Sequence, residues 1–460
     1  MAKKKEKTLE EKLQEALVPE NQWPYILPEH WCWTRLGKIT NVVGGGTPSS
    51  SKKEYYDNGT IPWLSPADLS GYSDIYISRG QKNITELGLS KSSARLMPKD
   101  TVLLSSRAPI GYVAIASNSI STNQGFKNFL PSDAFYSRFL YWYLKSSKSL
   151  LESYASGTTF LELSGSKASM VEFPLPPLPE QKRIVHRIES LFAKLDEAKE
   201  KIQQVLDGAE MRKVAILHKA FTGELTKNWR KENGISEDSW VEYTLQSVCT
   251  MKITDGTHKT PTYSDKENGV VFLSAKDITS GEINWENTKY ITSELHKELY
   301  SRLAPQINDI LLAKNGTTGV AALVKEDKVF DIYVTLALLR PNVEIVIPEY
   351  LLNIINSPLC KVQFNENLTG IGVPNLHLRD IKDVKIKVPS ISEQEIISDK
   401  VEMLLANEGM VTKNCLKQIE VIDTMKKSIL AKAFRGELGT NNPTEDSALN
   451  LLKEVIQGKS

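Results

Sequence analysis

Polar loops in both halves of the chain carry the residue types with which proteins bind nucleic acids. Lysine lies beside asparagine, glutamine or threonine in segments such as "STNQGFKN" at 121–128 and "AKNGTTG" at 313–319. Basic side chains contact phosphates, and amide and guanidinium groups also hydrogen-bond the edges of bases. For any single residue, an ordinary solvated loop is the alternative. The candidate DNA-binding residues are Lys52, Arg107, Asn123, Gln124, Thr159, Lys259, Lys314, Asn315 and Thr317.

No sequence motif for catalysis or for a bound cofactor is complete. The segment "GGGTPSSSKK" at 44–53 lacks the G-x-x-x-x-G-K-[ST] order of a phosphate-binding loop, and we expect a flexible loop there. "GIGVPN" at 370–375 lacks the third glycine of a dinucleotide fingerprint. Asp68 and Asp277 recur at equivalent positions and could form an acidic nuclease site, although turn and capping carboxylates are commoner. The sequence therefore favours a non-catalytic binding protein with no metal or cofactor of its own.

Composition and charge limit the class of protein further. The chain has 460 residues, of which 40% are hydrophobic and 25% are charged, enough for several domains with their own cores. Its cysteines lie far apart, and we recognise neither a signal sequence nor a membrane span, so we expect a cytoplasmic protein. The net charge is only +1, with a basic excess in 22–172 and an acidic excess in 240–386. Contacts with DNA phosphates must therefore come from local patches.

An internal repeat covers most of the chain. The segment "LHKAFTGEL" at 217–225 recurs as "LAKAFRGEL" at 430–438. At the same offset, "PEQKRIVHRIESLFAKL" from Pro179 aligns with "SEQEIISDKVEMLLANE" from Ser392. Further upstream, "WLSPADL" from Trp63 matches "FLSAKDI" from Phe272 with a slightly different offset. A period near half the chain indicates two copies of a whole module.

Each copy contains a long stretch of heptad periodicity. Apolar residues alternate in steps of four and three from Ile184, and again from Ile397, with Arg212, Glu408 and Gln418 as polar interruptions. We expect one continuous helix from Glu180 to Phe221 and an equivalent helix in the second copy. An antiparallel pairing of the two helices is favoured, because a parallel return would need a connection as long as the helix. A bundle core or self-association of the helices is the alternative.

The segments between these helices alternate short β-rich runs with helical patterns, which predicts an α/β (α+β) fold. The whole chain is then two globular domains separated by two long helices that form an antiparallel intramolecular coiled coil, in a pseudo-twofold repeat. The predicted segments are a charged helical extension at 1–26, globular domains at 27–176 and 227–388, helical regions at 177–226 and 389–438, and a C-terminal tail at 439–460.

The order of these motifs is similar to that of a known family. "LPEHWCWTRLGKI", "GGGTPS" and "IPWLSPADL", followed by "PLPPLPEQ" and "AFTGEL" and then by "VPSISEQ" and "AFRGEL", resembles the specificity subunit of Type I restriction-modification enzymes. The resemblance implies two target-recognition domains, each reading one half of a bipartite sequence in double-stranded DNA. It also implies that the paired helices set the spacer between the half-sites and dock two methyltransferase subunits.

The resemblance places the catalytic activities in partner subunits. Methyltransferase subunits would modify adenine with S-adenosylmethionine, and restriction subunits with a translocase motor would use ATP and Mg. Two other classes of function stay open at this point. One is a coiled-coil adaptor whose two β-rich modules bind sugars or proteins, and the other is a nuclease with its site at Asp68 or Asp277.

Overall fold

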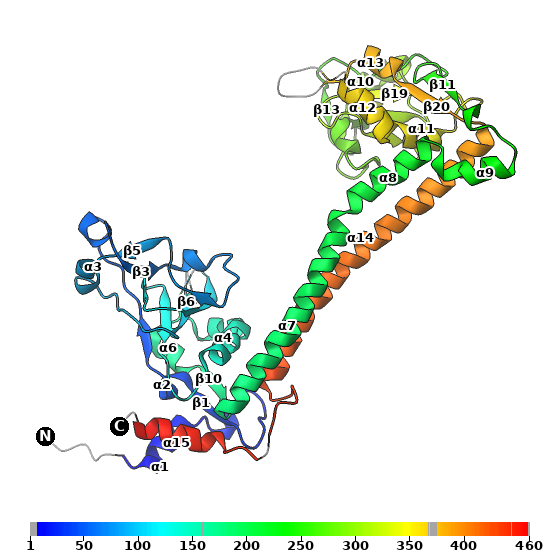
Figure 1. Ribbon diagram of the computed structural model, residues 1–460. Coiled ribbons are helices and arrows are strands. Elements are labelled where there is room, and N and C mark those ends of the chain that lie inside the picture. Colours follow the sequence, from blue (N-terminus) through cyan, green and yellow to red (C-terminus); the bar gives the residue numbers. More distant parts are fainter. Residues whose placement is uncertain are drawn as a thin grey trace. The chain divides into compact units, whose positions relative to one another are not determined.

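The computed structural model describes residues 7–107, 109–157, 161–366, 368, 375–442 and 444–458 (Figure 1). The chain divides into two compact units, of which the first is Met1–Lys201 with Gln418–Ser460 and the second is Ile202–Lys417. Each unit holds one globular domain and parts of both long helices. Among the described residues, no helix combines the length and apolar content needed to cross a lipid bilayer.

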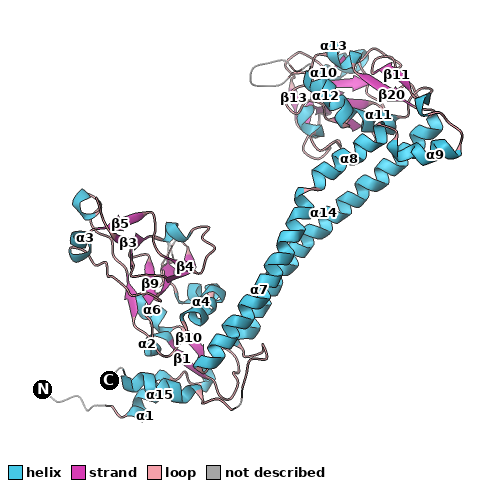
Figure 2. Ribbon diagram, viewed as in Figure 1, coloured by secondary structure: helices cyan, strands magenta, loops and turns pink. Residues whose placement is uncertain are grey.

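Three sheets build the globular domain of the first unit (Figure 2). The largest has the strand order β2 (Val42–Gly44), β9 (Phe126–Phe129), β6 (Val102–Ser106), β7 (Ile110–Ala116) and β4 (Tyr76–Ile77). A second sheet contains β5 (Lys82–Ile84), β3 (Ile61–Leu64) and β8 (Ser121–Thr122). The third pairs β1 (Cys32–Arg35) with β10 (Glu172–Leu175), so that the domain starts and ends on neighbouring strands.

The second unit repeats this plan with different side chains. Its first sheet has the order β12 (Thr254–Asp255), β19 (Leu336–Leu339), β16 (Ile310–Ala313) and β17 (Ala321–Leu323). Its second has β13 (Tyr263–Ser264), β15 (Lys289–Ile291), β14 (Val270–Leu273) and β18 (Phe330–Ile332), and β11 (Val241–Thr244) pairs with β20 (Lys385–Val388). The parallel pair β14–β18 corresponds to the parallel pair β3–β8. The repeat seen in the sequence is therefore a repeat of topology.

Short helices cover the sheets of both domains. In the first unit they are α2 (Leu36–Ile39), α3 (Glu86–Ser90), α4 (Ser137–Ser146), α5 (Lys148–Tyr154) and α6 (Gly165–Met170). In the second they are α10 (Ser293–Arg302), α11 (Pro348–Ile355), α12 (Pro358–Glu366) and α13 (Leu378–Asp383), while α9 (Lys227–Glu232) lies beside the start of α14 (Ile391–Phe434).

The long helices are α7 (Leu178–Asp207), α8 (Ala209–Phe221) and α14 (Ile391–Phe434). In the first unit, Asp196 contacts Lys426 and Lys199 lies 2.9 Å from Asp423. Residue numbers rise along α7 while those of its partners fall along α14, so the helices are antiparallel (Figure 2). Together with the repeated domains, this arrangement confirms the predicted fold class.

The expectation of one unbroken helix from Glu180 to Phe221 is wrong. The helix is interrupted at Gly208, where glycine removes side-chain contacts and raises the entropic cost of helix formation. Two of the three polar interruptions of the heptad pattern, Arg212 and Glu408, face each other beside this break. Arg212 Nε lies 3.0 Å from the Glu408 carboxylate, and Arg212 Nη2 donates to the carbonyl of Val205 at 2.9 Å. Each polar residue is therefore tolerated because the other neutralises it.

The repeated "AF.GEL" motif fixes the ends of the long helices to the globular domains. Phe434 packs edge-on against Phe139 and Tyr143, with ring centroids 5.3 and 5.1 Å apart. Phe221 does the same with Tyr350 at 5.2 Å. Each buried ring removes a large apolar area from water. The motif of each helical region therefore packs against the domain that belongs to the other copy.

The repeated Glu-Gln pair fixes the other ends of the helices. Gln181 accepts from the backbone N–H of Tyr136 and donates to the carbonyls of Ala134 and Pro176. Gln394 makes the same set with Ile347, Ile345 and Pro389. Both amides are fully buried, so every hydrogen bond replaces one that water would otherwise supply.

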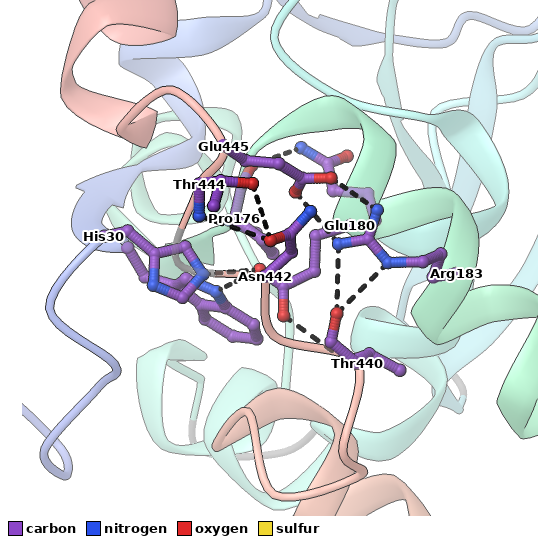
Figure 3. Close-up of polar contacts among 10 residues, drawn as sticks. His30, Pro176, Glu180, Arg183, Thr440, Asn442, Thr444 and Glu445 are labelled. Carbon is purple, nitrogen blue, oxygen red and sulfur yellow. Dashed lines mark hydrogen bonds and ion pairs between the residues drawn. The ribbon is translucent and has the colours of Figure 1, made fainter.

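The preceding glutamates are buried in the first turns of α7 and α14, where the helix dipole favours a negative charge. Glu180 accepts from Trp31 Nε1 at 2.8 Å and contacts His30 Nε2 at 2.7 Å (Figure 3). Glu393 accepts from Trp240 Nε1 at 3.2 Å and pairs with Arg230 Nη1 at 2.5 Å. The glutamate thus ties the start of each domain to a long helix.

The C-terminal segment completes the network of the first unit. Thr440 Oγ1 donates to Glu180, while Arg183 donates to the Thr440 carbonyl and to the carboxylate of Glu445 (Figure 3). The hydrogen bonds from Arg183 lower the pKa of the Glu445 carboxyl. Beyond it, α15 (Ala448–Gly458) packs against α1 (Leu9–Ala16) and joins the hydrophobic core (Figure 1). The segment predicted as a tail therefore contains a helix that is part of the first unit.

Replacement of Arg230 by Met should strongly destabilise the second unit. The change leaves Glu393 as an unpaired carboxylate in a site where both side chains of the pair are almost inaccessible, 7% and 1% exposed. Loss of one partner of a buried ion pair costs about 3 to 5 kcal/mol. Denaturant unfolding of the full chain measures the change. Lys201→Met, which breaks the exposed pair with Glu197, is the control and should unfold like the wild type.

Candidate nucleic-acid interface

Three loops of the first domain meet at one end of its largest sheet. They follow β2 at Gly44, follow β6 at Ser106, and precede β9 at Phe126. Gly44 on β2 and Leu104 on β6 both pair with Lys127 on β9, so the three strands are neighbours there. The structure therefore brings Arg107, Asn123 and Gln124 to the same end of one sheet.

Backbone contacts hold the glycine-rich loop against its neighbours. A Cβ atom on Gly45 would lie 2.0 Å from the Asn123 carbonyl oxygen, and one on Gly46 would lie 2.3 Å from the Ala94 nitrogen. Gly46 N–H donates to Thr122, and Trp63 Nε1 donates to the Gly46 carbonyl. The glycines thus permit close backbone packing, whereas the sequence suggested only a flexible loop.

The candidate side chains of the first domain differ in their exposure to solvent and in their contacts within the protein. Gln124 is exposed and accepts from Thr47 Oγ1, which joins two of the loops. Asn123 is half-buried, and its side chain accepts from Gly125 N–H at 2.8 Å in a local turn. Lys52 is exposed and lies over the Tyr55 ring. Arg107 is half-buried, and its backbone forms an isolated β-bridge with that of Glu162. Thr159 lies outside the described residues.

Lys127 is a basic residue at this end of the sheet that lies in the segment 121–128 singled out in the sequence but is not among the candidate residues. Its ammonium lies 3.2 Å from Ser106 Oγ and 3.7 Å from Glu162. Burial lowers the pKa of Lys127, because the charged form loses water, and Glu162 opposes this effect. The sequence places this lysine in the polar segment "STNQGFKN", but in the structure it belongs to the strand "FKNF", where every residue is buried.

The second domain presents loops at the equivalent end of the equivalent sheet. Lys314, Asn315 and Thr317 follow β16, and Lys259 lies in the loop after β12. The register pairs Asp255 on β12 and Leu312 on β16 with Ala337 on β19. The candidates of the second domain therefore occupy the same part of the fold as those of the first.

Here too the structure separates buried from exposed candidates. Lys314 is buried, with its ammonium 2.7 Å from Asp255, which also contacts His258. Lys259 is exposed and paired with Glu298. The backbone of Asn315 forms an isolated β-bridge with that of Asn375, and Thr317 is exposed. Each domain thus places one buried ammonium at this sheet end, Lys127 from β9 in the first and Lys314 from beyond β16 in the second.

The two recurring aspartates are structural. Asp68 accepts from the backbone N–H and the hydroxyl of Ser65 at 2.7 and 2.8 Å. Asp277 accepts from Ser274 in the same way, at 2.7 and 2.9 Å. Both complete capping boxes at short 3-10 helices, η3 (Pro66–Leu69) and η6 (Ala275–Ile278). Within the described ranges, no cluster of three His, Cys, Asp or Glu could hold a metal ion.

Known proteins are similar to this chain in sequence and in fold. A family model for the Type I restriction modification DNA specificity domain matches residues 28–207 and 237–421. The specificity subunit of the Type I restriction enzyme MjaIX from Methanocaldococcus jannaschii is 31% identical, with 90% of this chain and 94% of that protein covered. The EcoBI specificity subunit from Escherichia coli is 25% identical, with 94% and 93% covered.

Solved structures agree at the level of the fold. The HsdS subunit from Thermoanaerobacter tengcongensis matches with a TM-score of 0.61 at 18% identity, over 91% of this chain and all of that one. A chain from a structure that addresses complex assembly and conformational transition of the type I R-M system matches with a TM-score of 0.66 at 19% identity, over 90% of this chain. Because the family model covers both copies of the repeat, the chain belongs to the family of Type I restriction-modification DNA specificity subunits.

Proposed function

We propose that each globular domain reads one half of a bipartite DNA target through the loops at the described end of its main sheet. The observation that carries this proposal is the contrast between frame and loops. The sheets, the capping boxes and the Glu-Gln anchors recur in both domains, whereas the loop side chains differ. A conserved frame with varied loops suits the recognition of two different half-sites.

The long helices are proposed to dock two methyltransferase subunits. Both helices expose large apolar side chains to solvent, among them Met211 on α8 (76% exposed) and Met410 on α14 (58% exposed). These exposed side chains provide apolar area that a bound partner subunit would remove from water. The repeat would supply two equivalent docking surfaces for two copies of one subunit.

Catalysis is assigned to the partners. In this proposal, methyltransferase subunits modify adenine with S-adenosylmethionine, and restriction subunits with a translocase motor consume ATP in the presence of Mg. This chain supplies the sequence specificity in the cytoplasm. The adaptor alternative has no support from the relatives, and a nuclease site at Asp68 or Asp277 is disfavoured because both carboxylates are engaged in capping.

The exposed loop residues Gln124 and Thr317 should each affect one half-site only. Loss of a base contact costs about 1 to 3 kcal/mol and relaxes specificity at one position. Methylome sequencing of the assembled complex should show a relaxed first half for Gln124→Ala and a relaxed second half for Thr317→Ala. Each variant is the control for the other. Unchanged target sequences in both variants would reject this placement of the reading surface.

The paired helices should determine the length of the spacer between half-sites. Lys199 faces Asp423 across the coiled coil, so four residues inserted after each of them lengthen both helices together. Four residues add about 6 Å, comparable to nearly two base pairs at about 3.4 Å each. The methylome of this variant should show both original half-sites with a spacer longer by one or two base pairs. An active variant with the original spacer would show that the helices do not set the distance.

A further inference from the structure

A groove of about 990 Å³ lies between the second domain and α14, entirely within the second unit. Trp285, Leu352 and Leu405 provide apolar walls, and Glu349, Glu395 and Glu402 lie along them. None of the loops proposed to read DNA lines it. The groove therefore calls for a separate explanation.

The repeat defines the region of the first unit that is equivalent to this groove. Gln181 binds the backbone N–H of Tyr136 at the start of α4, and Gln394 binds that of Ile347 at the start of α11. Counting from these anchors, Arg138 and Trp142 on α4 correspond to Glu349 and Asn353 on α11.

The long helices correspond at the offset that relates Leu217 to Leu430. The equivalent pairs, first unit named first, are Lys182 and Glu395, Val185 and Ser398, His186 and Asp399, Glu189 and Glu402, and Phe192 and Leu405.

In the first unit, side chains fill the equivalent region, and its glutamate is paired with an arginine. Trp142 packs edge-on against Phe192, with ring centroids 5.2 Å apart, and donates to Glu189 at 3.1 Å. Arg138 Nη2 lies 2.8 Å from the same carboxylate. One aromatic ring and one guanidinium thus occupy the space and compensate the glutamate.

In the second unit, the residues that fill this region and neutralise the glutamate are replaced. Asparagine takes the place of the tryptophan, and acidic residues take the places of Arg138, Lys182 and His186. Within the described part of the chain, none of Glu349, Glu395, Asp399 and Glu402 forms an ion pair. These four carboxylates, together with those of Glu282 and Glu326, therefore border an open groove that has the single lysine Lys325 in its lining.

A buried polar group on the groove wall also lacks a partner. Ser398, which lines the groove, is only 8% exposed, and its hydroxyl makes no hydrogen bond. Its counterpart Val185 is a buried apolar residue that needs none. An unsatisfied buried hydroxyl costs free energy, so this wall of the groove lacks the apolar packing of its counterpart in the first unit.

From these differences we infer that the groove is the docking site for a basic, amphipathic helical segment of a partner polypeptide, with one such site per chain. Apolar side chains of the segment pack against Trp285, Leu352 and Leu405, and its lysines or arginines face the four carboxylates. DNA is excluded as the occupant, because its phosphates would be repelled. The inference is independent of the DNA-recognition proposal.

A synthetic peptide about 18 residues long, with leucines on one helical face and lysines on the other, is the probe. Fluorescence anisotropy with the full chain should show one site. The variant E349R/N353W, which recreates the filled region of the first unit, should weaken binding by about tenfold or more, equivalent to about 1.4 kcal/mol. The variant E395K/D399H alters only exposed positions and should also weaken binding of the peptide.

The exposed Glu267 lies outside the groove lining, so E267R is the matched charge control and should bind like the wild type. Equal affinity of the groove variants and the wild type would overturn the inference. Equal affinity for a peptide with glutamates in place of the lysines would also overturn it. The same holds if a DNA duplex displaces the peptide from the wild type and displaces it less well from the groove variants. Specific DNA binding should be unchanged in every variant, which separates this result from the proposed function.

Discussion

A buried glutamate in the first turn of each long helix holds a globular domain to its helical frame. Glu180 accepts from Trp31 at the start of the first domain, and Glu393 accepts from Trp240 at the start of the second. A carboxylate in such a position is stable only when donors surround it and the helix dipole favours its charge. The donors come from separate segments: His30 and Thr440 in the first unit, and Arg230 and Thr226 in the second. These networks bring distant parts of the sequence together, so the positions of the loops proposed to read DNA depend on them.

The same frame carries loops of different chemistry in the two domains. The main sheets share the strand order β2-β9-β6-β7 and β12-β19-β16-β17, and loops converge at the same end of each. A buried ammonium lies at each of these ends, but Lys127 and Lys314 reach it from different strands. Recognition can therefore change without a change of fold, because the anchors and the loops are separate sets of residues.

The sequence predicted the frame better than the surfaces. The repeat, the heptads and the AF.GEL motif follow from local patterns, so the coiled coil and the two-domain plan were predictable. The pairing of Arg212 with Glu408 and the burial of Lys314 depend on long-range packing that no local pattern encodes, whereas the break at Gly208 has a local cause, the glycine itself. Lys127 lies in a polar segment that the sequence singled out, but its burial beside Ser106 could not be predicted from that segment. The groove, which is present in the second unit and filled by side chains in the first, could not be predicted from the sequence, because it depends on how each domain packs against its long helix.

A duplicated first domain tests the central claim most directly. The backbone hydrogen bonds from Leu36 to Val171 and from Leu245 to Val384 close the two domains at equivalent points. A chain in which residues 36–171 also replace residues 245–384 would carry two identical reading surfaces on the original frame. Methylome sequencing of its complex should show a target whose two halves are inverted copies of the original first half. A target that keeps the original second half would contradict the assignment of one half-site to each domain.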